Sequence, residues 1–317
     1  MSSRFSISTG DSTKWDEFVR HSPQRTLYSE SCVLQCFGVP IRYVFVLKGN
    51  STVGGIALTE EGRDVRLQPY HAYAGIHFSS MSDYKIEKAI HTRFCVSEML
   101  AELLFNEYRT ITISNHWAVT DVRAFDWYNH HEREKGGYQI KVGYTSLLNL
   151  NPVDKLFQLF RSGRREDVKR ATMLGVNTEV TQELQNLDTL HRNTFAVQGI
   201  SRSPSERDLL LTICGTLIAK KRGVLIESKY KGKPAAASFW GLDCGLAHFM
   251  FGGSDPEYRH TGCATLNLYD AFKILAERYQ INSINMVGVN SPGRGDFKLG
   301  FGGNLTPYFN VSKISSS

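Results

Sequence analysis

The sequence predicts an α+β fold with mixed sheets of the α/β type, organised as two tandem domains at residues 1–150 and 151–317. Two observations support this prediction. Segments rich in β-branched and aromatic residues alternate with segments of helical periodicity, and the order of elements in the first half returns in the second. Each half contains helices, a three-strand antiparallel meander, a long helix and one further strand. We therefore expect in each half a mixed, mostly antiparallel sheet flanked by helices.

The first half supplies a hairpin and a long helix. Ile41–Leu47 is rich in β-branched and aromatic residues, and Gly49-Asn50 forms a turn before its partner strand. Apolar residues recur at helical spacing from Asp83 to Glu107. The expected order is a helix from Ser12 to Ser22, a helix at Ser29–Phe37, strands at Ile41–Leu47, Ser51–Leu58 and Arg63–Tyr70, a helix at Asp83–Glu107 and a strand at Thr110–Ser114.

The second half begins near Asn149–Val153, where Asn151-Pro152 is typical of a helix start. No residue-level repeat accompanies the repeated order, so the duplication is inferred from the pattern alone. The expected elements are helices at Pro152–Met173, Thr181–Phe195 and Pro204–Lys221, strands at Gly223–Lys229, Ala235–Leu242 and Leu246–Gly252, a helix at Thr261–Tyr279 and a strand at Ser283–Val289.

The composition is that of a folded protein, since 41% of the residues are hydrophobic and 21% are charged. The longest nearly apolar run, Leu209–Ala219, has 11 residues, whereas a membrane span needs roughly 18. The first residues lack the apolar segment of a secretory signal, so we expect a cytoplasmic protein. The six cysteines are scattered, and we expect small buried hydrophobic residues rather than disulfides or a zinc site.

The net charge of +6 permits a phosphate-bearing partner without requiring one. The densest basic cluster comprises Arg161, Arg164, Arg165, Lys169 and Arg170. Two interpretations stay open for this cluster: a solvated helix face, or a phosphate-binding patch where the two halves join.

The most informative stretch is Phe249–Ala264, in which a strand ends at Gly252-Gly253 and a helix opens after Arg259. Small residues at the opening, Gly262 and Ala264, would let a phosphate approach the free backbone N–H groups, which the helix dipole also favours. Arg259 could bind the same phosphate through two hydrogen bonds. The stretch could equally be an ordinary helix N-terminus.

These residues carry a family resemblance. Arg259-x-x-Gly262-x-Ala264 resembles the pyrophosphate-binding motif of the GNAT acyltransferase superfamily. Residues 290–302, with Phe297-Lys298-x-x-Phe301-Gly302, resemble the C-terminal signature of FemAB-like proteins, the tandem-GNAT transferases that include the peptidoglycan aminoacyltransferases. Three first-half segments are similar to that family in the same order, Gln68–Gly75, Asp121–His131 and Tyr144–Leu150. The resemblance implies two tandem GNAT-like domains.

The resemblance also implies the reaction. An N-acyltransferase would move an acyl or aminoacyl group to an amine of a sugar, amino acid or peptide-like acceptor by direct attack, without a covalent enzyme intermediate. The donor would be a thioester on coenzyme A or a carrier protein, or an aminoacyl-tRNA, and no cofactor would be tightly bound. Two further hypotheses stay open: a non-catalytic binding protein with the same fold, and a nucleic-acid-binding module. The acceptor, the acyl chain length and the oligomeric state stay open as well.

The resemblance assigns residues to roles. Lys298 would bind a donor phosphate or stabilise the developing negative charge, and Asp296 would act as a base or bind the acceptor, although they could equally be a surface lysine and a turn-forming aspartate. The first domain would bind the acceptor or support the structure, and its residues could equally serve packing. Adjacent histidines such as His130 and His131 point in different directions, so no metal is expected. The donor-binding set is Phe251, Gly252, Arg259, Gly262, Ala264 and Arg294, and the acceptor set is Tyr70, Tyr73, Trp127, Asn129 and His131.

Overall fold

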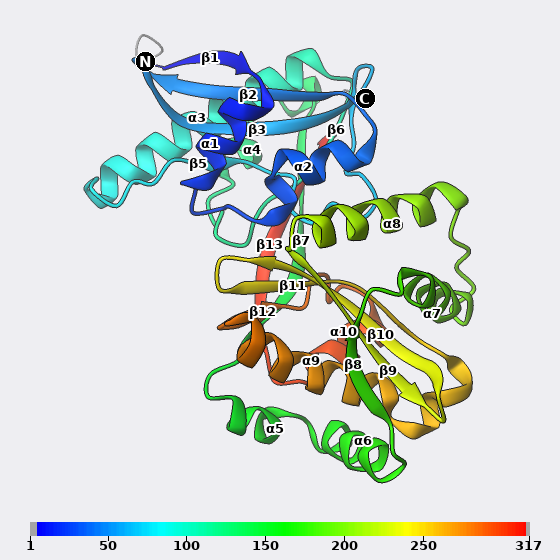
Figure 1. Ribbon diagram of the computed structural model, residues 1–317. Coiled ribbons are helices and arrows are strands. Elements are labelled where there is room, and N and C mark those ends of the chain that lie inside the picture. The colour runs from blue at the N-terminus through cyan, green and yellow to red at the C-terminus, as the bar shows by residue number, and fades with distance from the viewer. Residues whose placement is uncertain (1–4, 315–317) are drawn as a thin grey trace. The chain divides into compact units, whose positions relative to one another are not determined.

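The computed structural model describes residues 5–314 and divides into two compact units (Figure 1). Unit 1 comprises the chain up to Gly143 together with the segment from Pro307 onward, and unit 2 comprises Tyr144–Thr306. Each unit combines helices with a mixed, mostly antiparallel sheet, which confirms the predicted α+β class. The units differ from the predicted halves because residues 307–314 pack with unit 1.

In unit 1 the sheet has the strand order β1-β2-β3-β4-β6-β13, with β5 paired to β3. Strands β1, β2 and β3 are antiparallel, and β4 runs parallel to β6. The elements are β1 (Phe5–Gly10), α1 (Ser12–Arg20), η2 (Leu27–Ser29), α2 (Ser31–Leu34), η3 (Gln35–Phe37), β2 (Ile41–Lys48), β3 (Ser51–Glu61), β4 (Asp64–Val65), β5 (His77–Phe78), α3 (Ile86–Glu107), β6 (Thr110–Ser114), α4 (Arg123–Asp126), η4 (Arg133–Lys135), β7 (Gly137–Asn149) and β13 (Asn304–Ile314), the last two extending into unit 2.

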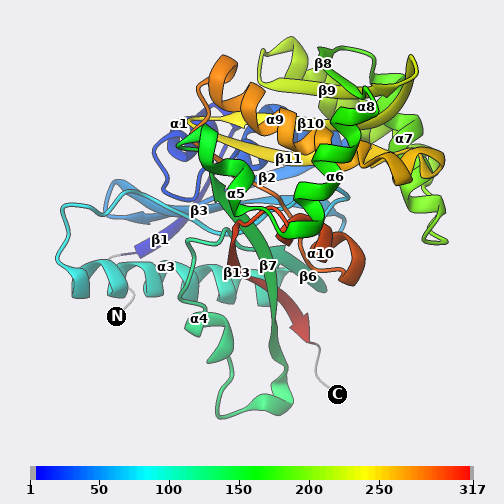
Figure 2. The ribbon, with the colours of Figure 1, turned by 90° about the horizontal axis from the view of Figure 1, so that it is seen from below.

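Two adjacent glycines on β3 let helices approach both faces of this sheet. A Cβ on Gly54 would collide with the Val96 side chain of α3, and a Cβ on Gly55 would crowd Trp15 of α1. Because successive strand residues face opposite sides, the pair Gly54-Gly55 opens one face to α3 and the other to α1. Helix α3 lies along the sheet in Figure 2 and supplies Val96, Leu100 and Leu104 to the core.

Unit 2 has the strand order β7-β12-β11-β10-β9-β8, in which only the β11–β12 pair is parallel. The predicted three-strand meander is confirmed as β9, β10 and β11. The elements are η5 (Val153–Lys155), α5 (Leu156–Leu159), α6 (Ser162–Met173), β8 (Asn177–Thr181), α7 (Leu184–Ala196), α8 (Pro204–Ala219), β9 (Gly223–Tyr230), β10 (Lys233–Asp243), β11 (Leu246–Ser254), η6 (Pro256–Thr261), α9 (Cys263–Tyr279), β12 (Ser283–Asn285) and α10 (Pro292–Leu299).

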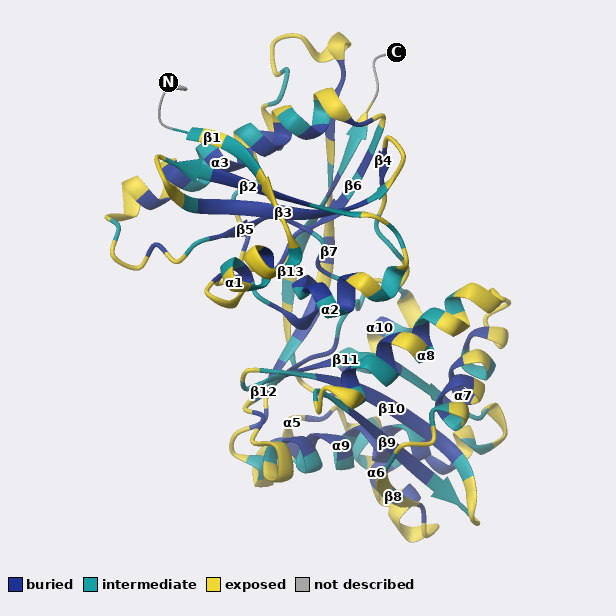
Figure 3. Ribbon diagram, turned by 45° about the horizontal axis from the view of Figure 1, so that its top comes forward, coloured by how far each residue is buried: buried dark blue, intermediate teal, exposed yellow. Residues whose placement is uncertain are grey.

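Helices cover both faces of the unit 2 sheet. On β9, Ile226 packs into the core that contains α9, whereas its neighbour Glu227 accepts a hydrogen bond from Asn186 of α7 at 2.8 Å. Alternation along the strand therefore assigns α9 to one face and α7 to the other. The sheet interiors are the most buried parts of each unit (Figure 3).

Two predicted strands are shorter in the structure. Within the predicted strand Arg63–Tyr70 only Asp64–Val65 pairs, so the antiparallel trio of unit 1 is β1-β2-β3. The predicted strand Ser283–Val289 ends at Asn285 because Val287 and Gly288 adopt positive φ angles of 39° and 61°. The short strands β1 and β8, with many exposed polar residues, escaped the sequence analysis.

None of the helices within residues 5–314 is long and apolar enough to span a membrane. All six cysteines are free, and only Cys214 and Cys263 are buried, so the prediction of small buried residues holds for those two. Cys244 is exposed in the β10–β11 turn, contrary to that prediction.

Buried histidines make stability depend on pH. Burial lowers the pKa of His71 and of His248 to about 4. In the unfolded chain these histidines have a pKa near 6.5. Between pH 6.5 and 4 the unfolded chain therefore binds protons at these two positions that the folded chain does not bind. The contribution of these histidines to the free energy of unfolding is therefore fully present above pH 6.5 and is lost as the pH falls toward 4. Each of these histidines contributes at most roughly 3 kcal/mol to that loss.

This expectation is checked by urea unfolding at a series of pH values from 7.5 to 4.5. His71→Phe should flatten the fall in the free energy of unfolding, since the variant removes one of the groups. An equally steep fall in His71→Phe would show that this side chain is not kept neutral by burial.

Candidate functional site

The centre of unit 2 is the point where β11 and β12 part. In the described chain the two strands pair only from Leu246 to His248 and from Ser283 to Asn285. From Phe249 onward, the edge of β11 that faces β12 has no strand partner among the described residues.

A β-bulge re-aims the side chains of β11 at the same place. Phe251 pairs with Phe239 and Phe249 pairs with Trp240, so Met250 is the extra residue. The bulge turns Phe249 and Phe251 to opposite faces: Phe249 packs on Trp240, with ring centroids 5.1 Å apart, and Phe251 packs against His191. Bulges of this kind are frequent beside active sites.

Lys298 extends from α10 to the chain that follows β12. Its Nζ donates hydrogen bonds to the carbonyl oxygens of Met286, at 2.8 Å, and Val287. The same ammonium group lies 4.9 Å from the centroid of the Phe249 ring on β11. The amine therefore lies between the chain that follows β12 and the Phe249 ring of β11.

The surroundings of Lys298 favour loss of its proton. Burial, followed by the positive charge of Arg294, lowers the pKa of Lys298 to about 7. An amine with this pKa is close to half protonated at neutral pH and can either donate or release a proton.

Two arginine side chains lie against the Phe195 ring of α7. The guanidinium carbon of Arg202 lies 3.9 Å from the ring centroid and that of Arg294 lies 4.6 Å from it. Arg202 forms an ion pair with Glu206 at 2.9 Å, whereas Arg294 has an intramolecular hydrogen bond to Ser291 at 3.2 Å. Burial lowers the pKa of Arg294, because the charged guanidinium group is partly removed from water.

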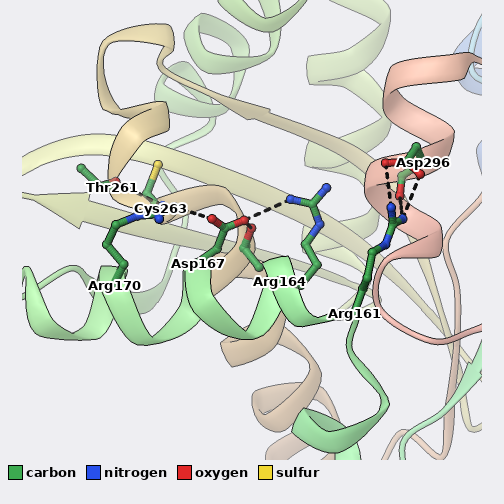
Figure 4. Close-up of polar contacts among 8 residues, drawn as sticks. Arg161, Arg164, Asp167, Arg170, Thr261, Cys263 and Asp296 are labelled. Carbon is green, nitrogen blue, oxygen red and sulfur yellow. Dashed lines mark hydrogen bonds and ion pairs between the residues drawn. The ribbon is translucent and has the colours of Figure 1, made fainter.

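The N-terminus of α9 is packed against protein (Figure 4). Gly262 adopts a φ of 82°, and a Cβ there would fall inside van der Waals contact with the Asp167 carbonyl of α6. The Asp167 carboxylate accepts a hydrogen bond from Thr265 at 3.1 Å, and the N–H of Cys263 donates to Thr261 at 3.2 Å. An acidic side chain thus occupies the helix end at which the sequence predicted an anion.

Two other predicted donor residues lie beside Gly262 in the chain. Arg259 is exposed in η6, and Ala264 is half-buried on the first turn of α9. Gly252 follows Phe251 on β11, where a Cβ would collide with the Phe249 ring. Phe251, Gly252 and Arg294 are therefore associated with the parting strands, whereas Arg259, Gly262 and Ala264 belong to the α9 N-terminus. Their roles toward a donor stay predictions.

The basic cluster around α6 is internally compensated, which favours the solvated helix face over the phosphate patch. Arg164 and Arg170 both pair with Asp167, and Lys169 pairs with Glu166. Arg165 donates to the Phe160 carbonyl at 2.9 Å.

Asp296 is held by a partner of its own, since Arg161 pairs with it at 2.9 Å (Figure 4). The hydrogen bond from Arg161 lowers the pKa of Asp296, so this carboxylate is a poor proton acceptor near pH 7. The base role predicted for Asp296 therefore has no support in its surroundings.

The predicted acceptor residues fall into two groups within unit 1. Tyr73 is buried, with its ring packed edge-on against Trp117 and Tyr308 at centroid distances of 5.1 and 5.7 Å. Tyr70 lies three residues earlier in the same connection and has a positive φ of 67°. Gly75, which follows, allows Asn115 to approach, because a Cβ there would collide with the Asn115 side chain.

Trp127, Asn129 and His131 belong to the segment after α4. Trp127 packs on Phe94 of α3, with ring centroids 5.8 Å apart, while Asn129 donates to the Gly136 carbonyl at 3.0 Å. His131 is exposed beside His130. The Asn129 bond and its φ of 53° give this residue a loop-forming role. Within the described residues, no group of three His, Cys, Asp or Glu side chains is arranged to hold a metal ion.

The sequence analysis missed Phe249, Val287 and Asn285. A bulge and a positive φ at a β-branched residue leave no signal in a single sequence. The only sequence sign was Gly288, which interrupts an otherwise continuous β-rich run.

Comparisons with known proteins agree with this geometry. Residues 159–299 match the family model of the acetyltransferase (GNAT) domain. The solved structure of FemX superposes with a TM-score of 0.65 at 14% identity, covering 96% of each chain. A tandem GNAT protein from the clavulanic acid biosynthesis pathway gives 0.56 at 10% identity, covering 99% of each chain. L-PGS from Bacillus licheniformis gives 0.50 at 12% identity, covering 96% of this chain and 92% of its own. No curated protein sequence matches significantly.

Residues 159–299 are therefore assigned to a GNAT domain. The whole chain has the fold of the FemAB-like, tandem-GNAT proteins, so the resemblance stated from residues 249–264 and 290–302 is confirmed.

The packing at the α9 N-terminus predicts a difference between two glycine variants. Gly262→Ala should lower the free energy of unfolding by about 1–3 kcal/mol, because the φ is positive and the Asp167 backbone blocks a Cβ. Gly293→Ala is the matched control, since its Cβ would meet open space at an ordinary φ, and should be neutral or slightly stabilising.

Denaturant unfolding of both variants at pH 7.5 measures the difference. Equal stabilities would mean that α6 does not pack on Gly262 in solution.

Proposed function

We propose that the protein transfers an acyl or aminoacyl group to the amine of a sugar, amino acid or peptide-like acceptor by direct attack. The observation that carries the proposal is the Lys298 amine between the diverging strands β11 and β12. Because the strand pairing ends here, a donor carbonyl bound at this place would have Lys298 on one side and the backbone of β11 on the other. The GNAT domain and the FemX-like fold support the same reaction class.

In the proposed mechanism the neutral acceptor nitrogen attacks the donor carbonyl carbon, and the carbonyl oxygen takes the negative charge. The charged form of Lys298 stabilises that oxygen, together with a backbone N–H of β11 near Phe251 or Gly252. The intermediate then collapses: the carbon–oxygen or carbon–sulfur bond to the donor breaks, the acceptor nitrogen loses one proton, and the leaving oxygen or sulfur takes up one proton. The amide product remains.

Among the donors, we favour an aminoacyl-tRNA over coenzyme A. Asp167 and the packed α6 occupy the helix end at which a pyrophosphate would have to bind, and a carboxylate repels such an anion. The two basic side chains near the parting strands, Arg294 and Lys298, are suited to a phosphodiester. A carrier-protein thioester remains the second donor in the proposal, since it would not need the α9 N-terminus.

The acceptor assignment belongs to the same proposal. Unit 1 would bind the acceptor or support the structure, with Tyr70 and Tyr73 as the acceptor residues, while Trp127 and His131 are less suited because they lie on an exposed segment. A cytoplasmic location, where charged tRNA is found, is part of the proposal.

Replacing Lys298 tests the proposed chemistry. Lys298→Met, which keeps the length and removes the charge, should lower kcat about 10²–10³-fold, as expected for loss of one group that stabilises an oxyanion. The charged form is the active one, so wild-type kcat/KM should fall as the pH rises through about 7. Lys273→Met is the control, because Lys273 pairs with Asp270 on α9.

The readout is amide formation from aminoacyl-tRNA with a panel of amines, and circular dichroism verifies folding. Unchanged turnover in Lys298→Met would remove this residue from the mechanism.

The donor preference is tested by thermal shift. A minimal aminoacyl-RNA hairpin should raise the melting temperature, and the increase should shrink with added salt because phosphates are bound. Arg294→Gln should weaken RNA binding about tenfold, the loss expected for one charged hydrogen bond. Coenzyme A and acetyl-coenzyme A should give no shift. A shift with coenzyme A that Arg259→Glu abolishes would overturn the donor assignment in favour of the thioester.

A further inference from the structure

The turn that ends β12 is strained. Val287 has a φ of 39° and Gly288 a φ of 61°. A β-branched residue is rarely found with positive φ, because its branched side chain clashes with the backbone there. Such a conformation persists only where surrounding contacts impose it.

Side chains within unit 2 impose this conformation. The Asn285 Oδ1 accepts a hydrogen bond from the Val287 N–H at 2.9 Å and another from the Thr145 hydroxyl. Both Asn285 and Thr145 are fully buried. The N–H of Met286 is fixed by the Ser146 carbonyl at 2.9 Å. The amide oxygen of Asn285 therefore closes the turn two residues after itself.

The turn also holds Lys298. The ammonium group has three N–H donors, and the carbonyls of Met286 and Val287 accept two of them. The third has only the Gly288 carbonyl at 3.4 Å, which is a long and weak contact. That third N–H is the one most easily given to a developing oxyanion.

We propose that Asn285 is a positioning residue: by closing the strained 286–288 turn, it fixes the carbonyls that orient the Lys298 amine between β11 and β12. The inference rests on the proposed function for its catalytic meaning, but its structural part stands on the contacts alone. Asn285 itself needs no contact with a substrate.

A packing role alone does not account for an asparagine at this position. An amide buried in a strand is costly unless its hydrogen bonds are made, and an apolar residue would pack the strand more simply. The run Ile284–Val289 is otherwise rich in strand-forming residues. Without the bond to Val287 the chain could continue as a strand beside β11 and close the gap in which Lys298 lies.

Hydrogen exchange tests the structural part without any assay of activity. Asn285→Leu removes both acceptor bonds, so the Val287 amide should exchange at least about fivefold faster, the change expected for one lost hydrogen bond. Asn285→Asp keeps an acceptor oxygen and should preserve slow exchange. Asn267→Leu is the matched control: it removes a buried asparagine of α9 that bonds the Ile226 carbonyl and Ser228, and should leave exchange at Val287 unchanged relative to global unfolding.

Kinetics test the catalytic part. Asn285→Leu should lower kcat about tenfold or more with little change in the KM of the donor, because orientation rather than binding is lost. In Asn285→Asp the added negative charge should raise the pKa of Lys298, which also responds to Arg294, and move the alkaline fall in rate to higher pH.

The outcomes separate the two claims. Fast exchange in Asn285→Leu together with absence of aminoacyl transfer in the wild type would leave the turn assignment intact and remove the proposed function. Slow exchange at Val287 in Asn285→Leu would overturn the positioning role whatever the activity. Loss of kcat in Asn267→Leu equal to that in Asn285→Leu would also overturn it, since the effect would then be one of general destabilisation.

Discussion

The parting of β11 from β12 is the constraint on which the site depends. A parallel pair of strands satisfies its backbone groups by continuing the ladder, so separation after His248 and Asn285 leaves groups that must be satisfied otherwise. On the β12 side, the Lys298 amine and the Asn285 amide supply those bonds. On the β11 side, the bulge at Met250 places Phe249 on the face that packs against Trp240. The end of this one strand pairing thus explains both why Lys298 bonds to the chain after β12 and why β11 has no strand partner there among the described residues.

Charge is distributed unequally around this interruption. At the α9 N-terminus, the helix dipole is already matched by Asp167, which in turn is paired with Arg164 and Arg170. Near the parting strands, Arg294 and Lys298 both have lowered pKa values, burial being the first cause in each case. Under the proposed function, an anionic donor would bind more favourably near the parting strands, because two partly buried positive charges there have no carboxylate of the described residues between them, whereas Asp167 already stands at the α9 N-terminus.

The sequence predicted those features that depend on local pattern. Hairpin β2–β3, helix α3 and the meander β9–β11 follow from periodicity and turn residues, and Lys298 was found through its motif. The contact of Asp167 with Thr265 joins residues 98 positions apart and has no local signal. No helix was predicted at α10, since its Pro292, Gly293 and Gly295 are poor helix formers. Tertiary packing overrides this preference: a Cβ on Gly295 would collide with the Val289 carbonyl, so the glycine permits the close approach.

Two carboxylates near the site, Asp296 and Glu206, are candidates for removing a proton from the acceptor amine in the proposed reaction, but both are already bound to arginines. Asp296 is bound to Arg161, and Glu206 is bound to Arg202 and to the Ser203 N–H, contacts that lower the pKa of both. A carboxylate held in this way is a weak base, so neither is suited to deprotonate an ammonium acceptor. In the proposed mechanism the acceptor amine therefore arrives neutral, and the proton it releases on amide formation passes to the leaving oxygen or sulfur. A lysine of pKa about 7 fits this arrangement, because it can stabilise the oxyanion while charged and can lend its proton to the leaving group when the intermediate collapses.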